Sequence, residues 1–309
     1  MRYWRYYPRF LQLLLLMLLL FTLFACTSVV LGVVLKPLFG FDLRAVLQVQ
    51  MDSPSALKHA FIFAQGLANV FHFLLAALLF AQLSHPQPLS YLGLTKVQKP
   101  LQIALVFGLM LSFIPAMNQL GVWLQQLDWG AQAKLNYDKT QQQLASVMSE
   151  RNIAHLLLYL FTFALLPAIG EELLFRGVIM RYSYHNAKNI HLAVLFSAAI
   201  FAMAHQSPFN FMPIMLAGIL LGYIYYYTGS IWLSILAHFV NNAFAVFALF
   251  YTNGIAHAQK VPQGQSFIYL LVLASLILFS ALFYLLRKNA SPLPKDWSDD
   301  FKGEHANTN

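Results

Sequence analysis

Eight apolar segments divide the chain, and each is long enough, or nearly so, to cross a bilayer, which requires about 20 apolar residues. Because a backbone in lipid must satisfy its own hydrogen bonds, such segments fold as helices. The sequence therefore predicts an all-α fold, a polytopic transmembrane helical bundle of about eight spans. The segments cover residues 10–35, 60–83, 101–125, 153–180, 191–207, 211–228, 231–251 and 267–286.

The composition agrees with lipid as the main solvent. Of the 309 residues, 59% are hydrophobic and 10% are charged, whereas soluble domains carry about 25% charged residues. The net charge is +8, but Lys and Arg are scattered between apolar runs and form no basic stripe. We therefore expect a lipid bilayer around the protein and no nucleic-acid partner. The single cysteine, Cys26, excludes an internal disulfide.

The chain divides into five parts by its polarity. Twelve of the 19 Lys and Arg residues fall on the side of the predicted bundle that holds both termini, and seven fall on the other. The positive-inside rule then predicts a multi-pass protein of the cell membrane with both termini in the cytoplasm. The parts are three N-terminal spans (1–125), a polar extramembrane helix or loop (126–152), a helical core (153–250), a final span (251–287) and a disordered tail (288–309).

Only the fourth predicted span carries Asp, Glu, Lys or Arg in its core, namely Glu171, Glu172 and Arg176. A charge at mid-membrane costs about 2.5–3.5 kcal/mol on insertion scales, so such residues indicate a functional site. The alternative is a shorter span that ends before Gly170, which would leave the three charges in a solvated cytoplasmic loop.

Helical geometry gives the two glutamates different roles. Glu172 and Arg176 are spaced i,i+4, so they share a face and can form a structural ion pair. Glu171 is rotated by about 100° from Glu172 and has no obvious cation beside it. A carboxyl group in this position is suited to exchange a proton with water. We therefore interpret Glu171 as the chemical group.

Two further polar features lie in the apolar spans. His205 ends the fifth segment four residues after Phe201, which can pack beside the imidazole. In the seventh segment, His238 and Asn242 are spaced i,i+4 and face the same way. A lone histidine in a span is more often a hydrogen-bonding partner between helices than a catalyst, so spacing alone assigns neither histidine a role.

Depth in the membrane brings Glu171 and His205 together. The turn between their segments is expected near Asn186–Asn189, and each residue lies 17 positions from Lys188, about 25 Å along a helix. Antiparallel neighbours would hold them at similar depth. His238 lies only nine residues past the turn at Gly229, about 13 Å. The sequence does not explain how His238 reaches the same level.

Three motifs occur in order along these segments. Residues 171–176 read EExxxR, residues 201–205 read FxxxH, and residues 238–242 read HxxxN. Each motif is weak alone, but the ordered trio in membrane segments resembles the CPBP family of intramembrane proteins. That family includes the type II CAAX prenyl endopeptidases and the bacterial Abi and lysostaphin-resistance-A-like proteins.

The resemblance implies an intramembrane endopeptidase that cleaves membrane-embedded or lipid-modified polypeptides. It implies that Glu171 activates water together with His205, and that His238 and Asn242 stabilise the oxyanion. Glu172, Arg176 and Phe201 would support them. The residue types agree, since amide hydrolysis needs a base for water and a donor for the oxyanion.

A metal is the open question of this interpretation, because the family is often labelled metalloprotease. Glu171, His205 and His238 could together bind zinc. The HExxH pattern is absent from the chain, and we favour a mechanism without a metal or other cofactor.

Other functions stay open at this point. A non-catalytic immunity or scaffold protein would use the motif residues structurally. A transporter or proton relay would also place Glu and His in the membrane, although spans one to three and eight offer no charged partner. A Ser234–His238 pair lacks a glycine-flanked elbow around the serine, and the absence of aspartate from the span cores argues against an aspartyl protease.

Overall fold

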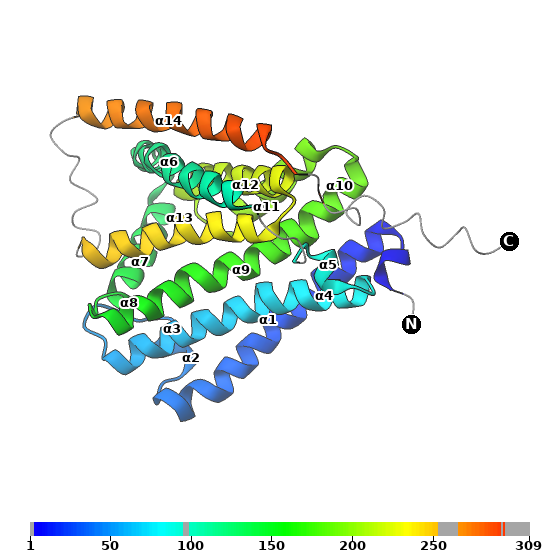
Figure 1. Ribbon diagram of the computed structural model, residues 1–309. Helices are drawn as coiled ribbons and strands as arrows, with labels where there is room; N and C mark the ends of the chain where they lie inside the picture. Colours follow the sequence, from blue (N-terminus) through cyan, green and yellow to red (C-terminus); the bar gives the residue numbers. More distant parts are fainter. Residues whose placement is uncertain (1–2, 95–98, 253–264, 292, 294–309) are drawn as a thin grey trace.

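The computed structural model describes residues 3–94, 99–252, 265–291 and 293. The tail predicted to be disordered, 288–309, lies outside these residues apart from its first few positions. The described part of the chain is helical and contains no strand (Figure 1).

The helices follow the apolar segments closely. Two of the long rods contain π-helical stretches, one in Ser55–Ser84 and two in Ile153–His185, which is why their parts carry separate labels. The elements are η1 (Trp4–Tyr6), α1 (Arg9–Phe39), α2 (Leu43–Val46), α3 (Ser55–Asn69), η2 (Val70–Leu75), α4 (Ala76–Ser84), α5 (Pro88–Tyr91), α6 (Pro100–Gln125), α7 (Ala131–Val147), α8 (Ile153–Tyr159), η3 (Leu160–Leu165), α9 (Leu166–Glu172), η4 (Leu173–Met180), α10 (Arg181–Ala187), α11 (Ile190–Ala204), α12 (Pro208–Thr228), α13 (Ile231–Tyr251) and α14 (Gln265–Lys288).

Seven helical stretches of the described chain are long and apolar enough to cross a membrane. The remaining predicted segment, the fifth in chain order, is α11. This helix has 15 residues and is therefore short for a span. The predicted fold class is confirmed: the protein is an all-α polytopic bundle of about eight spans. The seven are Arg9–Phe39, Ser55–Ser84, Pro100–Gln125, Ile153–His185, Pro208–Thr228, Ile231–Tyr251 and Phe267–Lys288.

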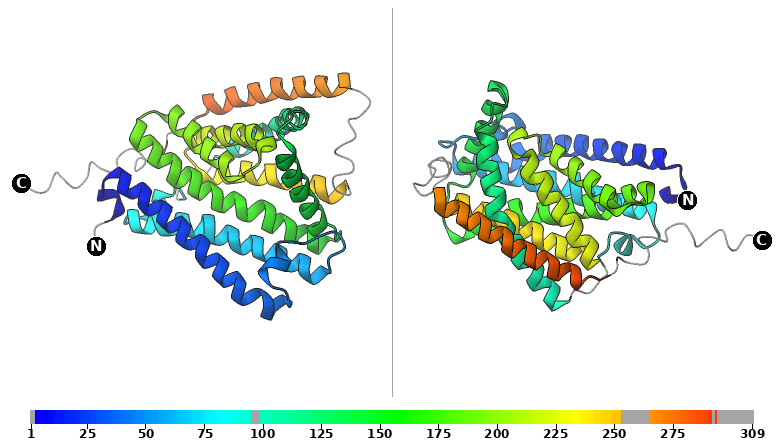
Figure 2. Two further views of the ribbon diagram at one scale, coloured as in Figure 1. Left: turned by 180° about the vertical axis from the view of Figure 1, so that it is seen from behind. Right: turned by 90° about the horizontal axis from the view of Figure 1, so that it is seen from above.

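The start of α1 and the end of α14 lie at the same end of the bundle (Figures 1 and 2). Tyr182, in α10, donates its hydroxyl to the Arg9 carbonyl at 2.8 Å. Ser291, just after α14, donates its backbone N–H to the Tyr227 carbonyl at 2.7 Å. We call this the terminal end, and the opposite end, where α7 connects α6 to α8, the α7 end.

Helices α11 and α12 form the closest-packed hairpin of the core through two glycines of α12, Gly218 and Gly222. A Cβ atom at Gly218 would lie 3.0 Å from Ala198 Cβ, and one at Gly222 would lie 2.9 Å from Val194 Cγ1. Small residues four apart let two helix backbones approach. This hairpin fixes the position of His205, which follows α11 directly.

The different depths expected for Glu171 and His238 have a structural explanation. Ile231 begins α13, and its Cδ1 lies 3.5 Å from the Cβ position of Gly177. The α12–α13 turn is therefore level with Gly177. The α10–α11 turn at Lys188 lies about 16 Å further along the helix that contains Gly177, so the two turns are at different levels. Glu171 lies six residues before Gly177 and His238 seven after Ile231, so both reach the same level.

Candidate active site

Four residues predicted to be catalytic line a single pocket of about 290 Å³: Glu171, His205, His238 and Asn242. They come from α9, from the turn after α11, and from α13, so segments more than 70 residues apart converge there. The remaining lining is mostly apolar and includes Phe163, Pro167, Ala245, Val246 and Leu249. The pocket therefore combines a few polar groups with an apolar wall, as ligand pockets commonly do.

Glu171 is held in a crowded part of the core and is 8% exposed. The preceding Gly170 makes this possible, because a Cβ there would lie 3.0 Å from Phe73 Cβ and 3.1 Å from the Leu74 backbone nitrogen. This close approach brings Asn69, the last residue of α3, to the pocket. Asn69 Oδ1 is buried and has no hydrogen-bond partner among the described residues.

The second glutamate, Glu172, is fully buried and accepts three hydrogen bonds. Arg176 Nη1 donates to Oε1 at 2.6 Å, Ser234 Oγ donates to Oε2 at 2.5 Å, and His238 Nδ1 lies 2.9 Å from Oε1. Arg176 Nη2 also donates to the Gly218 carbonyl at 2.7 Å. Glu172 and Arg176 thus connect the fourth span with α12 and α13.

This network orients His238 towards Glu171. A carboxylate only accepts hydrogen bonds, so His238 Nδ1 carries a hydrogen that it donates to Glu172. The other ring nitrogen, Nε2, lies 3.7 Å from Glu171 Oε2. The network also engages Ser234, whose hydroxyl bonds to Glu172 rather than to His238, which is the arrangement of a structural serine and not of a nucleophile.

His205 occupies the turn between α11 and α12. Its Nδ1 lies 2.8 Å from the Phe201 carbonyl, which only accepts, so Nδ1 carries the hydrogen and Nε2 of the neutral ring is free to accept a proton. The next residue, Gln206, has φ 51°, a conformation that costs a non-glycine residue about 1–2 kcal/mol. Pro208 then starts α12, where its fixed φ suits the first helical turn.

Phe201 is placed between the histidines and the buried arginine. Its ring centroid lies 4.8 Å from that of His205 and 5.7 Å from that of His238. The Arg176 guanidinium lies over the same ring at 5.0 Å. The expected packing of Phe201 beside His205 is present, and the contacts with His238 and Arg176 add to it.

The three possible zinc ligands, Glu171, His205 and His238, are less closely gathered than another group of side chains in the described structure. Among the residues that the structure describes, one group of three His, Cys, Asp or Glu side chains has all its donor atoms within 4.8 Å of one another, and it lies elsewhere, at His59, Glu150 and His155. The three groups in the pocket do not converge to that degree.

Three pocket residues lie outside the helical core predicted from the sequence, 153–250: Asn69, Leu144 and Met148. Asn69 is one of several polar residues in the second span, with Gln65 and His72, so its polarity alone did not distinguish it. Leu144 and Met148, at the end of α7, are apolar, and nothing in their local sequence says that α7 lies beside the pocket.

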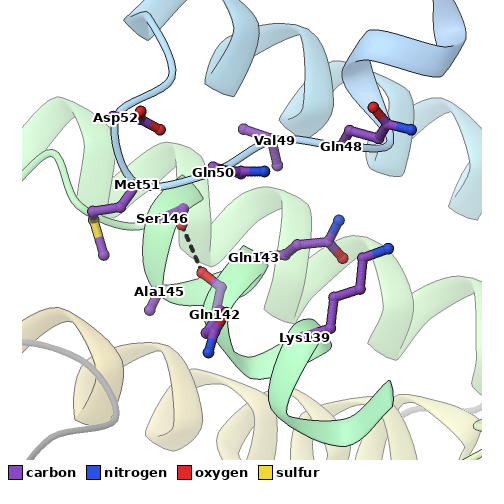
Figure 3. Close-up of a pocket in the computed structure, with 10 residues that line it drawn as sticks. All are labelled: Gln48, Val49, Gln50, Met51, Asp52, Lys139, Gln142, Gln143, Ala145 and Ser146. Atoms are coloured by element: carbon purple, nitrogen blue, oxygen red, sulfur yellow. Dashed lines mark hydrogen bonds between the residues drawn. The ribbon is translucent and has the colours of Figure 1, made fainter. Parts of the chain in front are cut away.

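A larger pocket, of about 920 Å³, lies at the α7 end between the segment 48–52 and α7 (Figure 3). Gln48, Gln50, Gln142 and Gln143 are among its mostly polar lining, and none of the predicted site residues belongs to it. Its size does not make it the active-site candidate, since no histidine and no glutamate lines it.

Comparison with known proteins agrees with the motifs. Residues 153–244 match the family model of type II CAAX prenyl endopeptidases described as Rce1-like. No curated protein and no solved structure matches the chain significantly. The matched stretch contains all four pocket residues named above, and the family supports intramembrane endopeptidase activity in general. Over residues 153–244 the chain thus matches the Rce1-like type II CAAX prenyl endopeptidase family, in agreement with the resemblance of its three motifs.

Proposed function

We propose that the protein hydrolyses peptide bonds of membrane-embedded or lipid-modified polypeptides within the membrane. The observation that carries the proposal is the convergence of Glu171, His205, His238 and Asn242 on one small pocket inside the family-matched part of the chain. The lining supplies a base, proton acceptors and an amide donor, together with apolar walls that suit an apolar residue or lipid chain.

In this proposal Glu171 and His205 activate the attacking water. Glu171 takes one proton while the water oxygen bonds to the carbonyl carbon of the scissile peptide. His205 Nε2, which is free because Nδ1 bonds to the Phe201 carbonyl, accepts a hydrogen bond from the same water. The proton held by Glu171 then passes to the leaving nitrogen as the C–N bond breaks, so the base acts next as the acid.

Asn242 and His238 stabilise the oxyanion that forms on the carbonyl oxygen. Asn241 Nδ2 donates to Asn242 Oδ1 at 3.3 Å, which leaves the Asn242 amide hydrogens free to donate into the pocket. His238 Nδ1–H is engaged by Glu172, so His238 can donate from Nε2 only when both ring nitrogens carry hydrogen. Asn242 is therefore the donor that needs no change of protonation.

Asn242→Ala is expected to lower kcat by about 10²–10³-fold, the usual effect of removing one oxyanion donor, with little effect on KM. The measurement is cleavage of a peptide with a lipid-modified cysteine near its C-terminus by the purified protein in liposomes. Asn118→Ala, on α6 and outside the pocket, is the matched control. Equal turnover by wild type and Asn242→Ala would remove Asn242 from the mechanism.

The positive-inside rule supports a cell-membrane protein with both termini in the cytoplasm, since the predicted spans assign twelve of the 19 Lys and Arg residues to that side. In this orientation the α7 end faces the opposite compartment. A fluorescent-protein fusion after Asn309 should fluoresce, because that reporter folds in the cytoplasm, and an alkaline phosphatase fusion at the same place should be inactive. An active phosphatase fusion would reverse the orientation.

A further inference from the structure

A cluster of three side chains at the α7 end lies outside the active-site pocket. His59 Nε2 lies 3.0 Å from His155 Nε2 and 3.6 Å from Glu150 Oε2, and His155 Nε2 is in close contact with the same Oε2. His59 lies near the start of α3, His155 lies in the first turn of α8, and Glu150 belongs to the segment between α7 and α8. Three donor atoms from three separate segments therefore converge on one point.

The hydrogen-bond pattern leaves the inner nitrogen of His155 without a hydrogen in the neutral ring. Asn152 Oδ1 caps α8 by accepting the backbone N–H of His155 at 3.0 Å, which identifies this atom as the amide oxygen. The same oxygen lies 2.9 Å from His155 Nδ1, so Nδ1 carries the hydrogen. The lone pair on Nε2 then faces a carboxylate, so this contact is favourable only with a proton on Nε2 or with a metal ion bound by both groups.

A neighbouring hydroxyl holds the carboxylate in place by its other oxygen. Ser55 donates its hydroxyl to the other oxygen, Glu150 Oε1. Lys58, which directly precedes His59, donates to the Met51 carbonyl at 3.0 Å and to Ser149 Oγ at 2.9 Å. Outer hydrogen bonds of this kind, from an amide oxygen to Nδ1–H and from a hydroxyl to a carboxylate, are characteristic of metal ligands.

We propose that His59, Glu150 and His155 bind a divalent transition-metal ion of the zinc class. Two imidazoles and one carboxylate are ligands that Zn²⁺ accepts, and three protein ligands leave a fourth position for water. The side chains are 37%, 26% and 19% exposed in that order, so the ion can enter from solvent. The site is separate from the Glu171 pocket and shares no residue with it.

The ion would join α3 and α8 to the chain that follows α7. Tyr159 already donates its hydroxyl to the carbonyls of Val147 and Glu150, at 3.0 and 3.2 Å, in this segment. Leu144 and Met148, which line the active-site pocket, lie just before it. A bound ion therefore stabilises the part of the chain that closes the pocket at the α7 end.

The test measures Zn²⁺ binding to the full-length protein, purified with a tag that contains no histidine and stripped with a chelator. Equilibrium dialysis and metal analysis by mass spectrometry should find one ion per chain in the wild type. His59→Ala and Glu150→Gln should each weaken binding by more than about 10-fold, since even loss of an outer partner costs 10–100-fold. Zn²⁺ should raise the Tm of the wild type but not of either variant.

Two further variants make the result decisive. His191→Ala removes an exposed histidine at the terminal end, and His205→Ala removes one from the active-site pocket. Both should bind Zn²⁺ as the wild type does. The proposal is overturned if His59→Ala, with an unchanged Tm in chelator, binds Zn²⁺ like the wild type, or if His205→Ala alone abolishes binding. The first result would mean that His155 is protonated and forms an ion pair with Glu150, with no metal ion bound.

Discussion

Glu171→Gln is expected to lower kcat/KM for peptide hydrolysis by at least about 10²–10⁴-fold, the usual contribution of a positioned general base. Glutamine has nearly the same shape as glutamate but cannot take a proton from water. The side chain is 11% exposed, and its Oε2 lies 3.7 Å from His238 Nε2. Turnover of the lipid-modified peptide in liposomes gives the rate, and membrane insertion and Tm establish that the variant is folded.

A matched pair of histidine variants accompanies this measurement. His205→Ala should lose activity to a similar extent, whereas His191→Ala, which removes a histidine bonded to Tyr223 at the terminal end, should retain it. Because Glu171 and His205 act on the same water, the double variant should be little worse than either single one. Full activity of Glu171→Gln, in folded protein, would contradict the proposed base.

Arg176→Met is expected to destabilise the fold by about 3–5 kcal/mol, because it leaves the Glu172 carboxylate buried without its cation. Both side chains are fully buried, and the Arg176 Nη1–Glu172 Oε1 distance is 2.6 Å. Methionine also removes the hydrogen bond from Nη2 to the Gly218 carbonyl. The free energy of unfolding in mixed micelles, measured by denaturant titration, gives the effect.

The control for this change is Arg44→Met, because Arg44 is an exposed arginine at the α7 end. That variant should shift stability by no more than about 0.5 kcal/mol. The double variant Glu172→Gln/Arg176→Met should cost less than the sum of its single changes, since removing both charges leaves none uncompensated. Arg176→Met with wild-type stability would show that the buried pair does not hold the bundle together.

The features that the sequence predicts well are those carried by local spacing. Apolar length gives the spans, and i,i+4 spacing gives the Glu172–Arg176 pair, which the structure contains at 2.6 Å. The turn between α10 and α11 also falls where expected: Lys188 adopts φ 53°, and the Asn189 side chain caps α11.

The features that the sequence leaves out depend on contacts between distant segments. His238 reaches the level of Glu171 because Ile231 packs at Gly177, and no local pattern encodes that contact. Asn69 reaches the pocket because Gly170 allows a close approach of the second span. The cluster of Glu150 with two histidines joins positions almost 100 residues apart.

The central claim is that this pocket cleaves peptide bonds, and it is tested most directly by mapping protein termini. Cells that express wild type, Glu171→Gln or His191→Ala at equal levels would be compared by mass spectrometry of the membrane fraction. The account predicts a set of new termini in membrane-embedded or lipid-modified proteins with wild type and His191→Ala, and their absence with Glu171→Gln. Identical termini in all three samples would contradict it.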